Sequence, residues 1–293
     1  MILKTLASRY YQMYLEPAEG MSESEVYKDI VLRGKKPAQA KAGIPAGFHG
    51  SAGDRMFTVK TPAGTPEIIY LADRSDFERI IRILADRCEN TAVPPTMGAC
   101  TIFGITNWRK IEKHKRDFKK NGGSDFGWIH EFRTFTSEDR NFQDTLIIVS
   151  RGGYSGITAE QAGFEEQQWI EYSLRIRAYH ECTHFVCRNL YPDTVDVLWD
   201  EILADCIGLC AAFGTYDIRL ARMFLGIAPD GSYRKGRLEN YFPAGTSMTA
   251  CADTAAGLIQ NLSERVSAGQ IDKNSDDALF SLACRLEQEH VSL

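Results

Sequence analysis

Residues 169–193 read WIEYSLRIRAYHECTHFVCRNLYPD, and they form the most regular helical pattern in the chain. Neither Gly nor Pro occurs from Glu165 to Tyr191, and Pro192 cannot continue a helix. Apolar residues recur at spacings that a helix gathers into buried surface; they are Trp169, Leu174, Ile176, Ala178, Phe185, Val186 and Leu190. The sequence therefore predicts one long helix over residues 165–191.

This helix carries the pattern H-E-x-x-H at residues 180–184. Side chains four positions apart project from the same helix face, so the imidazoles of His180 and His184 can reach a single metal ion. Glu181 follows the first histidine and projects to the side of that ion, where its carboxylate can act as a general base on water. The pattern is typical of a zinc-dependent hydrolase, whereas a chance match would leave an ordinary core helix.

A catalytic zinc ion usually has three protein ligands, and the next predicted helix offers acidic candidates for the third. This helix lies in TVDVLWDEILADCIGLCAAFG, residues 194–214. Glu201 and Asp205 are four positions apart and share a face. From Ile202 to Phe213 the only charged residue is Asp205, so we expect this face to be buried, where a carboxylate needs a cation. On these residues alone, either carboxylate could be the third ligand.

In these two motifs the chain resembles the gluzincins, the thermolysin-like group of zinc metallopeptidases. There, a helix with H-E-x-x-H is followed by a helix with N-E-x-x-x-D, and here residues 200–205 read D-E-I-L-A-D, with Asp200 in place of the asparagine. The resemblance implies that Glu181 is the general base and that Asp205 orients the ring of His180. It also implies that Zn²⁺ is held by His180, His184 and Glu201.

The activity implied by the resemblance is cleavage of a peptide bond in a peptide or protein substrate. Bound zinc would activate a water molecule, and Glu181 would take its proton and pass it to the leaving amine. A donor to the developing oxyanion is also expected. Six downstream residues are candidates for it, although each could equally have a surface or packing role: Tyr191, Tyr233, Arg234, Arg237, Tyr241 and His290. The alternative is a non-catalytic binding or regulatory protein that is stabilised by the metal.

The remaining patterns predict an α+β fold with a mixed N-terminal half and a mainly helical C-terminal half. Residues 56–60 and 68–73 flank a Pro/Gly turn and predict a hairpin. Residues 77–88 predict a helix capped by Ser75 or Asp76, and residues 101–120 predict another. Residues 1–50 predict irregular structure with little core. We expect an N-terminal region at 1–125 and a catalytic region at 126–293, which can form one continuous domain.

A strand is predicted at residues 145–150, before the long helix. By the gluzincin resemblance it would be the sheet edge that pairs with an extended substrate. An ordinary interior strand fits the same residues.

Composition narrows the kinds of partner that we expect. The formal net charge of −5 disfavours nucleic acid and anionic membranes. The N-terminus lacks the apolar run of a signal peptide, and no stretch predicts a membrane span. Eight cysteines in a chain of this length fit buried free thiols, which together with the missing signal suggests the cytoplasm. No feature of the sequence predicts an oligomeric state.

Overall fold

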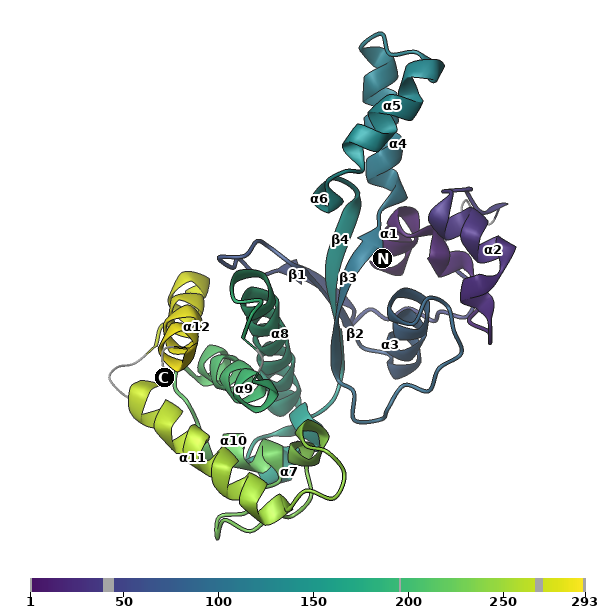
Figure 1. Cartoon of the computed structure of the whole chain (residues 1–293). Coiled ribbons are helices and arrows are strands. Elements are labelled where there is room, and N and C mark those ends of the chain that lie inside the picture. The colour runs from purple at the N-terminus through teal and green to yellow at the C-terminus, as the bar shows by residue number, and fades with distance from the viewer. Residues whose placement is uncertain (1, 39–44, 195, 267–270, 292–293) are drawn as a thin grey trace. The chain divides into compact units, whose positions relative to one another are not determined.

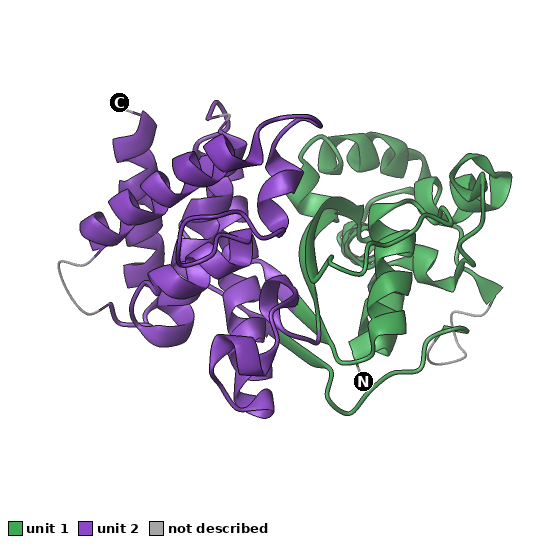
Figure 2. Ribbon diagram, turned by 90° about the horizontal axis from the view of Figure 1, so that it is seen from below, with its two compact units in different colours: residues 1–56, 69–150 green, residues 57–68, 151–293 purple. Residues whose placement is uncertain are grey.

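The computed structural model describes residues 2–38, 45–194, 196–266 and 271–291. The chain divides into two compact units, coloured separately in Figure 2: unit 1 is 1–56 with 69–150, and unit 2 is 57–68 with 151–293. The division therefore falls at Ser150 rather than at the expected boundary after residue 125. The reason is that residues 126–150 form helices and a strand that pack and pair within unit 1.

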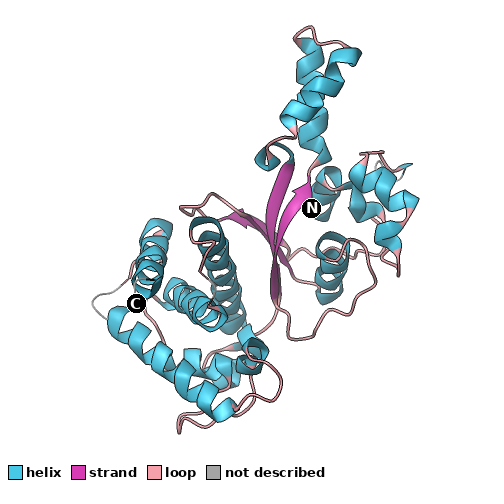
Figure 3. Cartoon of the chain, in the orientation of Figure 1, coloured by secondary structure: helices cyan, strands magenta, loops and turns pink. Residues whose placement is uncertain are grey.

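The chain has an α+β fold whose strands all precede residue 151 in the described part of the chain, as predicted (Figure 3). The four strands form one sheet in the order β1-β2-β4-β3. Their bounds are β1 Arg55–Thr58, β2 Glu67–Leu71, β3 Ala99–Thr106 and β4 Gln143–Ser150. The predicted hairpin strands β1 and β2 are neighbours in this sheet.

The strand that precedes the long helix is not the edge that the resemblance suggested. β4 lies between β2 and β3, and it pairs antiparallel with β3 from Ala99↔Val149 to Thr106↔Gln143. Its last five residues, Leu146–Ser150, are all buried. Since its hydrogen-bonding groups face strands on both sides, β4 has no free edge for an extended peptide.

The helices of unit 1 are α1 Ile2–Arg9, α2 Glu25–Tyr27, α3 Arg74–Ile80, α4 Trp108–Lys120, α5 Asp125–Phe135 and α6 Asp139–Phe142 (Figure 1). Two short 3₁₀-helices are η1 Tyr11–Tyr14 and η2 Met21–Glu23, and two short π-helical segments are η3 Lys28–Leu32 and η5 Ile81–Ala85. The helix predicted at 101–120 is thus a strand followed by a helix. Residues 101–106 are mostly β-branched or aromatic and favour β3, and the Asn107 side chain then caps α4.

Two other predictions about unit 1 were wrong. The cap of α3 is Asp73, whose side chain accepts hydrogen bonds from the backbone of Ser75 and Asp76. Asp76 itself is fully buried and accepts hydrogen bonds from the backbone of His49 and Gly50. The N-terminal segment is also part of the core, since Leu3, Leu6, Ala7 and Tyr10 form the buried stripe of an amphipathic helix and turn. Residues 39–44 of the segment expected to be irregular lie outside the described residues.

Unit 2 is helical from residue 151 onward. Its helices are α7 Ala159–Ala162, α8 Glu166–Leu190, α9 Val197–Phe213, α10 Ile218–Leu225, α11 Met248–Val266 and α12 Asp276–Val291, with the short turns η6 Tyr154–Gly156 and η7 Arg237–Tyr241. Of the described helices, none combines the length and the apolar character needed to cross a membrane. The eight cysteines are all described, none forms a disulfide, and six of them are buried.

Helices α8 and α9 pack against each other at the centre of unit 2 (Figure 1). α8 ends before Pro192, as predicted, and α9 starts at the Asp196 cap and ends at Gly214, whose φ of 78° is costly for other residues. The close approach depends on Gly208, because a Cβ there would lie 2.8 Å from the carbonyl oxygen of Ile176. This packing brings the residues of the two motifs to one place.

Candidate metal centre

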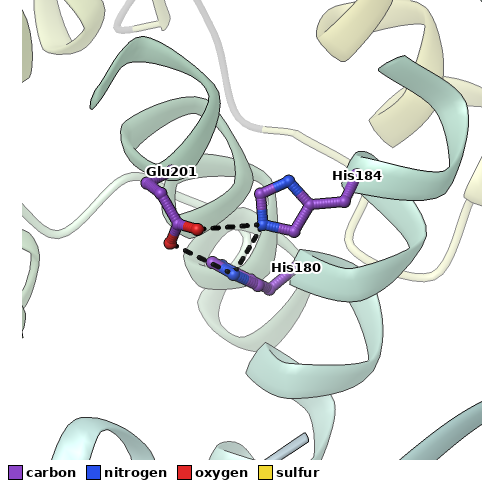
Figure 4. A group of neighbouring side chains, drawn as sticks. All are labelled: His180, His184 and Glu201. Atoms are coloured by element: carbon purple, nitrogen blue, oxygen red, sulfur yellow. Dashed lines mark hydrogen bonds and ion pairs between the residues drawn. The ribbon is translucent and has the colours of Figure 1, made fainter. Parts of the chain in front are cut away.

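Three side chains from α8 and α9 converge in unit 2 (Figure 4). The Nε2 atoms of His180 and His184 are 3.0 Å apart. Nε2 of His180 is 3.6 Å from Oε2 of Glu201, and Nε2 of His184 is 3.6 Å from Oε1 of the same carboxylate. The sequence predicted these three residues as a ligand set, and the structure brings them together.

These distances fit a metal ion at the centre of the group. Ligand atoms about 2.0–2.2 Å from a tetrahedral zinc ion lie about 3.3 Å from one another, close to the observed 3.0 and 3.6 Å. The side chain of His180 is 8% exposed, whereas those of His184 and Glu201 are 23% and 22% exposed. The group is therefore mostly buried but accessible to solvent on one side.

The carboxylate of Asp205 lies beside the His180 ring, on the side of Nδ1 and away from the converging Nε2 atoms. Nδ1 of His180 lies 3.0 Å from Oδ1 of Asp205, which is the role that the resemblance assigned to Asp205. Because a carboxylate accepts hydrogen bonds, Nδ1 carries the ring proton and Nε2 presents its lone pair to the group.

Asp205 is held in turn by two further side chains. The hydroxyl of Tyr154 donates a hydrogen bond of 2.5 Å to its Oδ1, and Nη2 of Arg237 donates to its Oδ2. Nη1 of Arg237 also donates to the Tyr154 hydroxyl at 2.9 Å. Burial alone would raise the pKa of the Asp205 carboxyl, but the Arg237 charge and the hydrogen bonds from His180 and Tyr154 hold it below its ordinary value. Asp205 is therefore ionised at neutral pH, and its negative charge lies beside Nδ1 of His180.

A second carboxylate stands behind the other histidine. Nδ1 of His184 lies 3.0 Å from Oδ2 of Asp200, the residue that replaces the asparagine of the gluzincin motif. Burial lowers the pKa of His184, but its hydrogen bond to Asp200 and the charges of Asp200, Glu201 and Glu181 outweigh burial and raise it to about 9. Both rings therefore have the same arrangement, with a carboxylate on Nδ1 and Nε2 turned inward.

Two inward lone pairs 3.0 Å apart repel unless a cation lies between them. In the metal-free protein a proton on His184 can fill this role, since its pKa is raised to about 9. A metal ion bound by both Nε2 atoms would replace that proton. The donor set itself therefore favours a cation at this position.

Glu181 occupies the α8 position next to His180 and is half-buried. The negative charge of Glu181 is one of the causes that raise the pKa of His184, so its carboxylate is close enough to interact with that imidazole. It is not one of the three converging side chains, and its role as a general base stays a prediction.

Two of the six candidate oxyanion donors lie at this centre. Tyr241 donates a hydrogen bond of 2.8 Å to Oε2 of Glu201, and Arg237 binds Asp205 as described above. The other four interact elsewhere: Tyr191 with Gln288, Tyr233 with Gly236 and Glu239, Arg234 with Asp230, and His290 with Asp196 and Trp199. Arg237 and Tyr241 are the first and last residues of η7, a short 3₁₀-helix.

Sequence reasoning missed Tyr154. Its loop is held by α8, because the Arg177 guanidinium donates to the carbonyls of Gly152 and Gly153 and the Ser173 hydroxyl accepts from the backbone of Tyr154. Gly153 is required there, since a Cβ would lie 2.0 Å from the carbonyl oxygen of Ile157. The pair of glycines after β4 was the only local signal.

A second group of metal-binding residue types occurs in unit 1, formed by His49, Asp73 and Asp76. Its carboxylates already have structural partners, because Asp73 caps α3 and Asp76 binds the backbone of His49 and Gly50. His49 is largely exposed, with 64% of its side chain accessible. This group therefore forms a junction between a loop and a helix start.

No curated protein and no solved structure is detectably similar to this chain. One family model does match, and it covers residues 2–283, nearly the whole length. The chain therefore belongs to DUF7005, a family of unknown function.

Proposed function

We propose that the protein is a zinc-dependent hydrolase that cleaves peptide bonds, with its reaction centre on α8 and α9. The observation that carries this proposal is the convergence of two imidazole nitrogens and a carboxylate at 3.0–3.6 Å, with a carboxylate behind each imidazole. Carboxylate–histidine pairs of this kind orient the rings of metal-binding histidines and make them better ligands.

Zinc is the metal that this donor set suits best. Two histidines and one glutamate are a common protein ligand set of catalytic zinc, and they leave a fourth position for water or substrate. Asp205 and Asp200 would keep the His180 and His184 rings in the ligand tautomer during turnover. Calcium and magnesium prefer oxygen ligands and would be disfavoured by two imidazoles.

The reaction would divide between the metal and the protein's own side chains. When bound, zinc supplies a Lewis acid that polarises the substrate carbonyl and acidifies water. Glu181 would accept a proton from the attacking water and return it to the leaving nitrogen. The single proton of the Tyr241 hydroxyl is donated to the Glu201 carboxylate at 2.8 Å, and it would turn from there to the developing oxyanion. Arg237 would position Asp205 rather than touch the substrate, because both of its Nη atoms have partners.

The test is to measure bound zinc and the cleavage of a mixed peptide library by the wild type and by Glu181→Gln. We expect about one zinc ion per chain in both proteins, and activity at least about 100-fold lower in the variant. The matched control is Glu166→Gln, which makes the same chemical change at an exposed position of α8. It should retain full activity.

Other results would contradict the proposal in different ways. Equal activity of Glu181→Gln and the wild type would remove Glu181 from the reaction. Zinc binding without cleavage of any library peptide would favour the non-catalytic, metal-stabilised alternative. Zinc binding that persists unchanged in His184→Ala would place the metal elsewhere in the chain.

A further inference from the structure

Unit 2 contains a cavity of about 550 Å³ beside α10, apart from the residues of the metal centre. Its volume lies within the range of about 300–1,000 Å³ that is typical of small-molecule sites. One face of α10 and the segments that follow it form much of the wall. Aliphatic side chains supply its apolar part, namely Ile157, Ile218, Met223 and Ile227.

Four cationic side chains also line this cavity: Arg219, Arg222, Arg234 and Lys235. No acidic residue belongs to the wall, as far as the described residues define it. The carboxylate partners of Arg219 and Arg234 are distant or exposed, with Asp217 at 3.8 Å and Asp230 at 3.4 Å. Each also donates one shorter hydrogen bond, Arg219 to the carbonyl of Ala162 and Arg234 to the hydroxyl of Ser232. Pairs exposed in this way are weak and can rearrange toward a ligand.

Arg222 is the only one of the four cations that is half-buried, whereas the other three are exposed. Its Nε is covered by protein and has no hydrogen-bond partner, as is also true of Nε in Arg79 and Arg237, so a ligand would meet its Nη atoms. Among the described residues Arg222 forms no ion pair, and a half-buried charge gains more from an anionic partner than an exposed charge does. Lys235 also forms no ion pair with any carboxylate of the described residues. Its ammonium group is therefore available to an anion in the cavity.

We propose that this cavity binds a single-chain amphiphile, an aliphatic chain that ends in an anionic head group. The head group, a carboxylate or a phosphate monoester, contacts Arg222 and Lys235, and the chain lies against the aliphatic wall. No aromatic side chain lines the cavity among the described residues, so it lacks a stacking surface for a nucleotide base or another flat ring. Flexible residues such as Met223 suit a chain without fixed shape.

The test is calorimetric titration of the full chain with decanoate, decyl phosphate and the uncharged decanol. Both anions are expected to bind one per chain, at least about tenfold more tightly than decanol, because hydrogen bonds to charged groups are strong. Octanoate should bind about fifteenfold more weakly than decanoate, since each buried methylene contributes about fourfold. The tighter of the two anions identifies the head group.

Variants connect the binding to the proposed residues. Arg222→Met should weaken decanoate binding about tenfold or more. It should not lower the stability of the ligand-free protein, because it removes an unpaired charge. Lys235→Met, at an exposed position, should weaken binding severalfold and serves if Arg222→Met does not fold. The matched control is Arg285→Met on α12, which leaves the cavity intact and should bind as the wild type does.

The proposal is overturned if neither anion binds saturably below its micelle concentration, or if decanol binds as tightly as they do. Wild-type affinity in both Arg222→Met and Lys235→Met would also overturn it. The titrations are made with zinc-loaded and chelator-treated protein, and with Glu181→Gln. They are independent of the proposed hydrolase activity, so either inference can fail without the other.

Discussion

The hydroxyl of Tyr241 donates a hydrogen bond of 2.8 Å to Oε2 of Glu201, the same oxygen that lies 3.6 Å from Nε2 of His180. A residue from η7, 40 positions along the chain, thus contacts the third candidate ligand directly. Burial raises the pKa of the Tyr241 phenol, and the Glu201 charge adds to this effect. The phenol therefore stays protonated at neutral pH and can act as a donor.

We predict that Tyr241→Phe lowers kcat for peptide cleavage about 100-fold or more and leaves zinc bound. The reason is that one donor to a developing oxyanion contributes about 10²–10³ in kcat. Steady-state kinetics with zinc analysis of the same preparation checks this. Tyr233→Phe is the control, since its hydroxyl binds Gly236 and Glu239 outside the centre. An unchanged kcat in Tyr241→Phe would assign the phenol a structural role.

We predict that removing either carboxylate behind the histidines weakens zinc binding. Asp200→Asn should raise the zinc Kd about 10-fold, and Asp205→Asn should raise it up to about 100-fold. The difference arises because the Asp200 side chain is 42% exposed, whereas Asp205 is 3% exposed and also binds Arg237. Competition titrations with a chromogenic chelator measure both values.

The two variants also differ in their expected free energy of unfolding. Asp205→Asn leaves the Arg237 guanidinium without its carboxylate and should cost about 3–5 kcal/mol of stability. Asp200→Asn should cost much less, because water can reach its site. Equal zinc affinities and equal stabilities for the two variants would contradict the roles given to these carboxylates.

The sequence predicted those parts of the centre in which two side chains are spaced one helical turn apart. His180 and His184 are one helical turn apart, as are Glu201 and Asp205, so the period of the helix places each pair on one face. The short turn between α8 and α9 then limits how the two faces can meet. For this reason His180 and His184 could be named from the residues, with Glu201 or Asp205 as the third side chain, and the gluzincin resemblance then selected Glu201.

The rest of the centre depends on contacts that no local period records. Tyr154 lies 26 residues from His180, and Arg237 lies 32 residues from Asp205. Their approach is fixed by loops that α8 and α10 hold in place. The interior position of β4 was hidden for a similar reason, because strand order depends on which partners pair and not on the strand's own residues.

We predict that Asp144 makes the stability of unit 1 depend on pH. Burial alone would raise the pKa of this carboxyl, but hydrogen bonds from Lys110, Tyr10 and Asn107 hold it below its ordinary value of 3.8. A folded-state pKa below the unfolded value stabilises the fold above pH 3.8, and this contribution is lost as the pH falls below 3.8. The loss is expected only on the acid side.

The measurement is the free energy of unfolding of wild type and Asp144→Asn against pH. At neutral pH the variant should be less stable by about 1–3 kcal/mol, and the difference should shrink below pH 3.8. Asp139→Asn, at an exposed position of unit 1, is the control and should follow the wild type. A difference that stays constant down to low pH would exclude Asp144 as the titrating group.

We predict opposite effects of the same substitution at two helical glycines of unit 2. At Gly208 a Cβ would lie 2.8 Å from the carbonyl oxygen of Ile176, so Ala would force α9 away from α8 and cost about 1–3 kcal/mol. At Gly257 in α11 a Cβ would meet nothing within 4 Å, so Ala should stabilise the helix by up to about 1 kcal/mol. Because α8 and α9 carry the candidate ligands, Gly208→Ala should also weaken zinc binding, while Gly257→Ala should not. Denaturant unfolding and zinc competition on both variants check this, and similar behaviour of the two would mean that the α8–α9 contact does not set the ligand geometry.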